Sequence, residues 1–456
     1  MKPSSLIPPA LLAATAVLVL LVLSLTGRMS PLVEPDSQTY LNFDFSSLTA
    51  ALTQIRTFGY PLFLKTIGSV ERVPFFQWLV HSVACGLFYV GLVRVGYRSA
   101  VAFACSATLL LSRAVFEWVN HVTADGLAAA MAIASAGALL AVLSRTKTVA
   151  GWPGLVAFTF LAYQIRPAYL FLIPLWPIAG FWLDTFLLRR DNGLATRLFR
   201  ASGYAAATVL PFLAFCTLRL LVVGHWGLVS FGGYNVVGIS AQFLDAELVR
   251  ELPEELQPLA ERIVDGRSRL TDYRPADSYE AMEEMFNPTV WTLTVPAARE
   301  LCADDPVAVN QLLSQLAGTV IRRRPARYLQ WLLWNANHAR QQLLPLVVFD
   351  RGSIVVLSLF AAVLLSSLIR GEASDRVTAQ AGASPQQLHI ERHVLLWLAV
   401  GFVVAKTLLV ILVEPAIGRY LVAAGMFVPA AIAIWVVHFV EQRLPVSQPP
   451  TNCPTA

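Results

Sequence analysis

Apolar runs of about 20 residues recur along the chain and constrain its fold more than any other feature. A helix of that length crosses the roughly 30 Å of hydrocarbon in a bilayer. Because hydrocarbon offers no hydrogen-bond partner, every backbone polar group must be satisfied within the chain, which favours helices. Only 14% of the 456 residues are charged, against about 25% in a typical soluble domain. The sequence therefore predicts an all-α, polytopic membrane protein.

The runs predict ten membrane spans and three modules. The spans are expected near 8–26, 74–93, 99–116, 124–143, 150–165, 167–187, 203–223, 352–369, 393–413 and 421–440. The N-terminal transmembrane module is 1–223, with spans one to seven and a long outer loop at 27–73. A mainly helical extracytoplasmic domain follows at 224–345, because this stretch is hydrophilic and has few β-branched alternations. The C-terminal transmembrane module is 346–456.

Basic residues between the runs predict the orientation. With the N-terminus inside, the inner loops carry Arg94, Arg98, Arg145, Lys147, Arg189, Arg190, Arg197, Arg200, Arg370, Arg376, Arg392 and Arg443. This is the positive-inside pattern, so both termini are predicted to be cytoplasmic. The outer first loop also holds Arg28, Arg56, Lys65 and Arg72. The net charge of +5 thus reflects membrane orientation, and no nucleic-acid partner is indicated.

The stretch Glu34-Pro35-Asp36-Ser37-Gln38-Thr39-Tyr40 follows the first span and is expected on the outer side. Asp36 can cap a helix that begins at Ser37. Asp36 can equally act as a base at the membrane surface. Further along, Leu41 to Ile55 has the spacing of a helix that lies on the membrane, which Gly59-Tyr60-Pro61 is expected to break before a second helix from Leu62.

Two more acidic positions lie on the predicted outer side. Asp125 opens the fourth span, where it suits either a helix N-cap or a substrate contact. Glu117 and His121 are four residues apart at the end of the third span. They can pair with each other, bind a cation or orient a substrate. One histidine and one glutamate are a weak metal signal, so metal ligands remain unknown.

Cations on the same side suit an anionic ligand. Arg166-Pro167 ends the fifth span, where Arg166 either binds a phosphate or reaches to the lipid headgroups. Lys406 lies inside the ninth span, which costs about 3 kcal/mol unless an anion is near. Arg419-Tyr420 precedes the tenth span, and Arg419 either binds a phosphate or pairs with Glu414. Arg322-Arg323-Arg324 is a basic cluster that is expected at the headgroups.

Four short motifs, in order and on one predicted side, resemble the GT-C-fold glycosyltransferases of the dolichyl-phosphate-mannose protein mannosyltransferase and aminoarabinose transferase class. Asp36 stands four residues before Tyr40, as the first acid of that family's outer-loop pair does, with Ser37 in place of the second. The other motifs are Arg56-Thr57-Phe58-Gly59-Tyr60-Pro61-Leu62, Gln164-Ile165-Arg166-Pro167 and Arg419-Tyr420. The predicted ten spans and large outer segment are also similar.

The resemblance implies an inverting transfer, in a bacterial inner membrane, of a sugar from a polyprenyl-phosphate donor to a lipid, glycan or protein acceptor. Asp36 would be the base, and Glu34 or Asp125 would orient the acceptor. Arg166, Lys406 and Arg419, with the Arg322–Arg324 cluster as a further candidate, would hold the donor phosphate, because fixed cations stabilise a leaving phosphate. The groove would be lined by Tyr40, Arg56, Tyr60, Glu117, His121 and Tyr420. A divalent metal cofactor is left open.

Three other functions compete with this interpretation. A transporter or lipid flippase would need polar groups along a path through the bilayer, and apart from Lys406 the predicted spans are almost free of charge. A non-catalytic scaffold would need none of the outer polar groups. An enzyme resembling O-antigen ligases would use a diphosphate donor. The chain lacks a Gly-rich phosphate loop, a Gly-x-Ser-x-Gly elbow and a His-Glu-x-x-His motif, so ATP-driven and classical hydrolytic chemistry has no support.

Overall fold

The structure is a computed structural model, and it describes residues 7–144, 151–188, 193–268, 270, 273–369 and 385–443. Within these ranges the chain is mainly helical and forms no strand, apart from one isolated bridge between Leu32 and His121. The predicted all-α character is confirmed for this part of the chain. Six of the predicted inner-loop charges, Arg145, Lys147, Arg189, Arg190, Arg370 and Arg376, lie outside the described residues.

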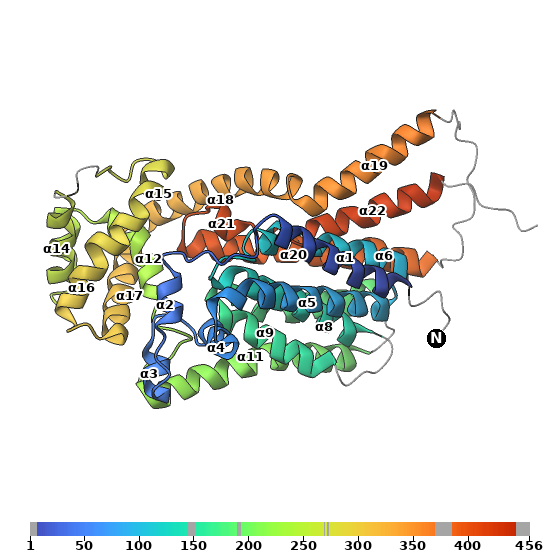
Figure 1. The fold of residues 1–456 in the computed structure, drawn as a ribbon. Coiled ribbons are helices and arrows are strands. Elements are labelled where there is room, and N and C mark those ends of the chain that lie inside the picture. Colours follow the sequence, from blue (N-terminus) through green and yellow to red (C-terminus); the bar gives the residue numbers. More distant parts are fainter. Residues whose placement is uncertain are drawn as a thin grey trace, which may run out of the picture.

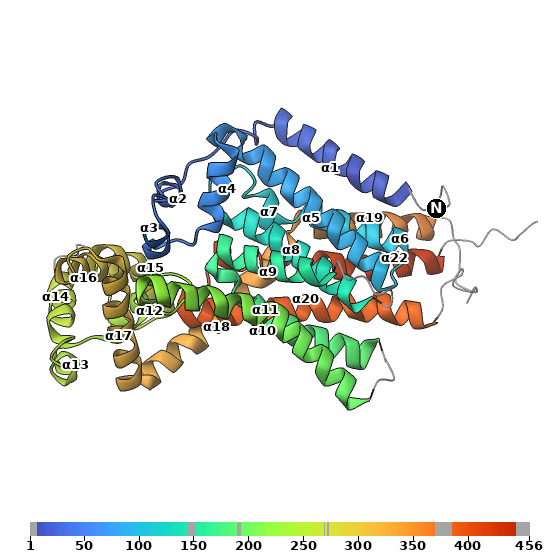
Figure 2. The same ribbon diagram turned by 90° about the horizontal axis from the view of Figure 1, so that it is seen from below.

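The long helices run side by side in one bundle (Figures 1 and 2). They are α1 (Ile7–Leu25), α5 (Val73–Val95), α6 (Ser99–Leu110), α8 (Ala124–Leu143), α9 (Gly151–Ile165), α10 (Leu172–Trp182), α11 (Leu194–Val223), α19 (Arg351–Ile369), α20 (Pro385–Val413) and α22 (Val428–Arg443). Short turns extend three of them: η2 (Val70–Arg72), η3 (Pro167–Tyr169) and the π-turn η4 (Leu183–Leu187).

Seven helical stretches among the described residues are long and apolar enough to cross a membrane. An eighth is added if α18 (Pro325–Val348) and the first part of α19, which meet at a 56° bend, form one broken span. The predicted fifth span, α9, has only 15 residues, and the apolar part of α22, Val428–Phe439, is also short. The described residues thus support a multi-pass membrane protein with seven or eight spans by length and composition, and the predicted number of ten is not confirmed.

Helix α8 lies at the centre of the bundle and is buried along almost its whole length. Its composition explains this, since alanine and glycine let neighbouring backbones approach closely. At the crossing with α5, a Cβ atom on Gly91 would overlap the carbonyl oxygen of Gly137, and one on Gly137 would overlap the backbone of Leu87. The two helices are therefore in backbone contact, which fixes the position of α8 along α5.

A second hydrophobic core lies at one end of the bundle (Figure 1). It is built by the helical domain, by which we mean α12 (Gly232–Ser240), η5 (Ala241–Phe243), α13 (Ala246–Glu251), α14 (Gln257–Arg267), α15 (Tyr279–Asn287), the π-turn η6 (Pro288–Thr294), α16 (Val295–Leu301) and α17 (Pro306–Arg323). Helix α18 leaves this core at Trp331 and joins the bundle at Ala339. We call this end of the bundle the domain end, and α1 begins at the opposite end.

The loop that follows α1 differs from its predicted form. Instead of one helix over Leu41–Ile55 it holds α2 (Ser37–Leu41) and α3 (Leu48–Thr53), and Gly59 begins α4 (Gly59–Ile67) instead of breaking a helix. A Cβ atom on Gly59 would lie 2.5 Å from the carbonyl oxygen of Gln164, so glycine is needed there for close packing. Two of the motifs singled out in the sequence thus touch each other.

A buried ion cluster closes the opposite end. Glu391 on α20 is fully buried and accepts hydrogen bonds from the Arg98 guanidinium at 2.8 Å and from the Arg98 backbone N–H at 2.8 Å. His438 Nε2 donates to the same carboxylate at 2.8 Å, and His438 Nδ1 accepts from Arg392 Nε at 3.1 Å. We call these four residues the Glu391 cluster.

Candidate functional site

The acidic stretch after α1 is held against the loop before α8. Leu32 N–H donates to Asn120 O at 2.7 Å, and Leu32 O accepts from Val122 N–H at 2.9 Å. Ser37 is fully buried, donates to Val122 O at 2.8 Å and accepts from the backbone N–H of Glu34 at 2.8 Å. Serine at this position therefore joins two loops. A glutamate at position 37, which the GT-C resemblance would lead one to expect, would be buried beside the carbonyl oxygen of Val122.

Asp36 sits at the N-cap position of α2, as predicted, but its side chain makes no capping hydrogen bond. Its Oδ1 accepts from Arg56 Nη2 at 3.1 Å and its Oδ2 from Arg419 Nη2 at 3.1 Å. Arg56 is fixed further by a 3.0 Å hydrogen bond from its Nε to Thr39 Oγ1 and lies over the Tyr40 ring at 5.0 Å. Both carboxylate oxygens are thus engaged by guanidinium groups, and capping does not account for the residue.

Asp125 lies in the first turn of α8, and the N-cap is Thr123, so the N-cap prediction for Asp125 was wrong. Asp125 Oδ2 accepts from Arg419 Nη2 at 3.2 Å, and Asp125 Oδ1 pairs with Arg166 Nη1. Arg419, on α21 (Gly418–Leu421), therefore bridges Asp36 and Asp125. Burial acts to lower the pKa of Arg419, but Asp125 and Asp36 reverse that effect and raise its pKa above the usual value.

Lys406, on α20, lies 2% exposed beside these pairs. Its Nζ donates to Ala168 O at 3.1 Å and lies 5.1 Å from the Tyr169 ring centre and 5.7 Å from that of Phe171. No carboxylate of the described residues lies within ion-pair distance of Lys406. A carbonyl oxygen and aromatic faces only partly compensate a buried cation, so an anion would stabilise it.

These groups surround a small cavity of about 10 Å³, room for about one water molecule. Its lining includes Asp125, Arg166, Lys406, Arg419 and Tyr420, together with Trp118 and Tyr169. Trp118, whose ring lies 5.1 Å from the Arg419 guanidinium, was missed in the sequence because a tryptophan at a span end is typical of lipid interfaces. Burial raises the pKa of Tyr420, whose ring lies 5.7 Å from the guanidinium of Arg166.

Glu414 is half-buried and was the alternative pairing partner that the sequence suggested for Arg419. Its Oε1 accepts from Asn235 Nδ2 of the helical domain at 2.6 Å, so the predicted Arg419–Glu414 alternative was wrong. Burial raises the pKa of Glu414, and the nearby Arg166 and Lys406 oppose that rise. This carboxyl therefore joins the helical domain to the cavity region.

Glu117 and His121 do not pair with each other. Glu117 pairs with Arg113 at 2.8 Å, and His121 Nδ1 lies 2.8 Å from Glu34 Oε1. The β-bridge at Leu32 brings Glu34 to His121, which overrides the helical spacing of Glu117. No group of three or more potential metal ligands occurs among the described residues, so the possible metal gains no ligand set.

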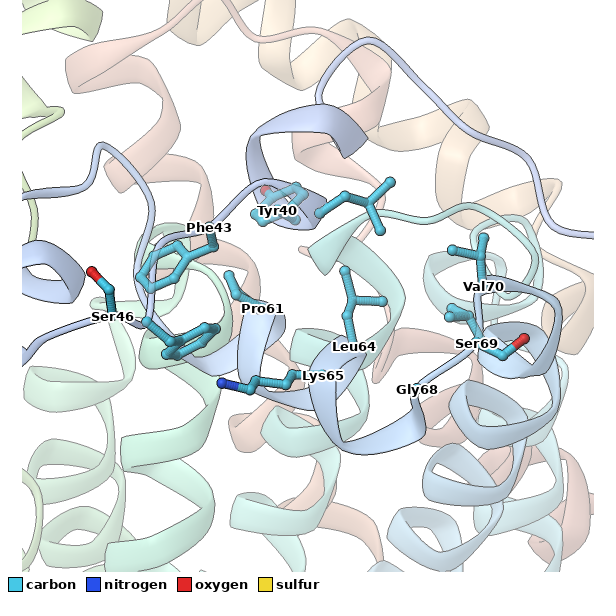
Figure 3. Close-up of a pocket in the computed structure, with 12 residues that line it drawn as sticks. Tyr40, Phe43, Ser46, Pro61, Leu64, Lys65, Gly68, Ser69 and Val70 are labelled. Atoms are coloured by element: carbon cyan, nitrogen blue, oxygen red, sulfur yellow. The ribbon is translucent and has the colours of Figure 1, made fainter.

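A second, larger pocket of about 500 Å³ adjoins Tyr40 (Figure 3). Its lining is mainly apolar and includes Phe43, Phe45, Pro61, Leu64 and Val70. The polar side chains of Ser46, Lys65 and Ser69 also line it. Tyr40 packs edge-on against Tyr60, with ring centres 5.0 Å apart. Tyr40 therefore stands between this pocket and Arg56. Tyr60 is fully buried behind it and lines neither cavity.

The basic cluster Arg322–Arg324 is not part of this arrangement. Arg324 pairs with Asp245 at 3.3 Å and with Glu247 at 4.0 Å within the helical domain, while Arg322 bonds Thr319. Comparisons of the chain with models of protein families, with curated proteins and with solved structures gave no match.

Proposed function

We propose that the protein is an integral-membrane inverting glycosyltransferase that moves a sugar from a polyprenyl-phosphate donor to a lipid, glycan or protein acceptor. The observation that carries the proposal is the meeting of Asp36, Asp125, Arg166, Lys406 and Arg419 at the domain end. These residues come from five separate segments of the chain, and each is a carboxylate or cation that the sequence assigns to this chemistry.

The charges of this group favour an anionic ligand. Asp36, Asp125 and Glu414 supply three carboxylates against the four cations Arg56, Arg166, Lys406 and Arg419. The three arginines are engaged by Asp36 and Asp125. The ammonium group of Lys406 has no such partner among the described residues, and a phosphate beside it and Arg166 would supply the missing negative charge.

Exposure separates the two acids by role. The Asp36 side chain is 40% exposed, whereas that of Asp125 is 9% exposed. An acceptor hydroxyl can therefore reach Asp36, and Asp125 is better suited to hold Arg166 and Arg419 in position. Asp36 is the base of the proposed reaction, and Asp125 is a positioning residue.

In the proposed reaction the acceptor hydroxyl donates a hydrogen bond to Asp36 and attacks the anomeric carbon of the donor sugar. The new C–O bond forms as the bond to the donor phosphate breaks. The hydroxyl proton passes to Asp36, and the bonding electrons leave with the phosphate, whose charge Lys406 and Arg166 stabilise. Attack opposite the leaving group inverts the anomeric centre. The products are the glycosylated acceptor and polyprenyl phosphate.

The size of the central cavity adds a requirement. Room for about one water cannot hold a sugar ring, and Arg419 lies between the two acids. Binding therefore requires Arg419 to leave Asp36, which also frees a carboxylate oxygen for the acceptor. We assign the 500 Å³ pocket beyond Tyr40 to the acceptor, because a volume of 300–1,000 Å³ with few polar groups is usual for small-ligand sites.

The test is a transfer assay with purified protein in membranes. A panel of polyprenyl-phosphate sugars and polyprenyl-diphosphate sugars, each labelled in the sugar, is offered with a total membrane extract as acceptor. We expect transfer from a monophosphate donor, and a fall of about 10²- to 10⁴-fold in Asp36→Asn. Asp265→Asn, an exposed carboxylate on α14, is the control and should retain full rate.

Transfer only from diphosphate donors would support the competing O-antigen ligase-like function. An Asp36→Asn protein that is folded and fully active would remove the assigned base. Absence of transfer by wild-type protein from every donor would refute the proposal as stated.

A further inference from the structure

The turn α7 (Arg113–Phe116) and the residue after it carry charged side chains that do not line the central cavity. Ala114 and Trp118 line the cavity. Arg113 and Glu117, four residues apart, instead pair with each other at 2.8 Å. The same short turn therefore lies between the cavity and a second charged group, which the proposed reaction leaves unexplained.

Two further arginines join this group from distant segments. The Arg351 guanidinium lies 4.4 Å from the centre of the Phe116 ring and 3.7 Å from Glu117 Oε1. The Arg28 guanidinium lies 5.5 Å from the centre of the same ring. Arg28 follows α1, Arg113 begins α7 and Arg351 begins α19, so three elements bring their guanidinium groups together. We call Arg28, Arg113 and Arg351 the arginine cluster.

The arginine cluster is held in place by a buried carboxylate. Asp350 is 5% exposed, and its Oδ2 accepts from the backbone N–H of Arg113 at 2.7 Å. Its Oδ1 accepts from the backbone N–H of Gly352 at 2.8 Å. Asp350 thus ties the start of α7 to the start of α19 through backbone groups and fixes Arg113 relative to Arg351.

The cluster has fewer negative than positive charges. Among the described residues, Glu117 is the only carboxylate that pairs with these side chains, and it serves both Arg113 and Arg351. Arg28 has an aromatic face and no carboxylate partner in this part of the chain. With Glu117 and the backbone-bonded Asp350, the three guanidinium groups stand beside two carboxylates, which leaves positive charge in excess. A phosphate, with several acceptor oxygens, would balance that excess.

The position along the bundle indicates where the phosphate comes from. Arg28 follows the apolar helix α1 by three residues, Arg113 lies near the end of the apolar stretch Ser99–Phe116, and Arg351 is the first residue of the apolar helix α19. The ends of membrane-spanning helices lie at the level of the lipid headgroups. The side chains of Arg113 and Arg351 are 33% and 37% exposed, so a headgroup can reach them.

We propose that Arg28, Arg113 and Arg351 bind the phosphate group of a membrane lipid, at a site separate from the central cavity. The lipid is either an ordinary anionic phospholipid or a polyprenyl phosphate, which share this chemistry. The site does not depend on the proposed transferase activity. Because Ala114 of α7 also lines the central cavity, a lipid bound here would help to fix the position of Trp118, whose ring contacts the Arg419 guanidinium.

The test measures lipid binding to the full-length purified protein by native mass spectrometry after removal of bound lipid. The probes are phosphatidylglycerol, polyprenyl phosphate and, as a lipid without phosphate, diacylglycerol. In the double variant Arg28→Gln/Arg351→Gln we expect affinity for a phosphate-bearing lipid to fall roughly 10- to 30-fold, from about three- to fivefold per arginine lost. The preferred probe identifies the source of the phosphate.

The control is Arg250→Gln/Arg262→Gln, which removes two exposed arginines of the helical domain, on α13 and α14, and should bind lipid as the wild type does. If the double variant does not fold, Arg28→Gln alone repeats the test, because the Arg28 guanidinium lies against a ring face and pairs with no carboxylate of the described residues. We expect a several-fold loss. The proposal is overturned if a folded variant binds both phosphate lipids like the wild type, or if diacylglycerol binds as tightly as they do.

Discussion

Two groups of buried charges lie at opposite ends of this bundle, and they differ in how completely their members are paired. In the Glu391 cluster, the carboxylate takes the side chain and backbone of Arg98 and the ring of His438. The remaining nitrogen of that ring takes Arg392. Every charged group has a partner, and Glu391 is fully buried. At the domain end, Asp36 is 40% exposed, and Lys406 has a carbonyl oxygen and two aromatic rings but no carboxylate partner among the described residues.

The difference separates a structural role from a binding role. A saturated, closed ion cluster offers no site to a ligand and joins helices to each other, here α20, α22 and the start of α6. An incompletely paired and partly exposed group can exchange its internal partners for those of a substrate. Composition does not distinguish the two clusters, since both contain carboxylates and arginines; pairing and exposure do.

The largest expected effect on stability comes from breaking the saturated cluster. Glu391→Gln removes the charge that compensates Arg98 and should lower the free energy of unfolding by about 3 kcal/mol or more, because the remaining charges lose their partner. Chemical denaturation in detergent measures it. Transfer per folded molecule should stay at the wild-type value, and a selective loss of turnover with normal stability would contradict the structural role.

An opposite result is expected at the incompletely paired site. Lys406→Met removes a buried cation that has no carboxylate, so the free energy of unfolding should rise by about 1 kcal/mol or more. The KM for the donor should rise at least tenfold, since the phosphate loses its cation. The control is Arg250→Met, an exposed residue on α13. A destabilised Lys406→Met protein with unchanged KM would assign the lysine to the fold.

The smallest effect concerns pH. The pKa of Glu414 is raised by burial, so between its unfolded and folded pKa values the folded protein holds a proton that the unfolded chain has lost. Stability should therefore decline as pH rises from about 4.5 to the folded pKa, and level off above it. Glu414→Gln should flatten this decline in thermal unfolding measured from pH 4 to 8. An identical slope in the variant would show that another group is responsible.

Features that depend on neighbouring residues could be predicted from the sequence. The helix start at Ser37 and the helix end at Arg166-Pro167 can be predicted from neighbouring residues, and α2 and α9 bear these positions out, although the Asp36 side chain does not cap α2. The apolar runs predicted helices, although the number of spans depends on how short or bent a helix may be, as α9 and the α18–α19 pair show.

Pairing between distant residues could not be predicted in this way. Helical spacing favoured Glu117 with His121, but the bridge at Leu32 brings Glu34 to that histidine. The arginine cluster was missed for the same reason. Each arginine alone resembles an orientation charge at a span end. Only the fold shows that Arg113 and Arg351 share the carboxylate of Glu117, and that Arg28 and Arg351 share the ring of Phe116.

The glycine contact between α5 and α8 has a consequence for chemistry far from it. Gly137 is about 18 Å along α8 from Asp125, and α8 touches α5 there backbone to backbone. Any side chain at Gly91 or Gly137 would push the helix aside and shift the carboxylate that α8 carries at its tip. The absence of side chains at two glycines in the apolar interior therefore determines the position of Asp125 relative to its arginine partners at the domain end.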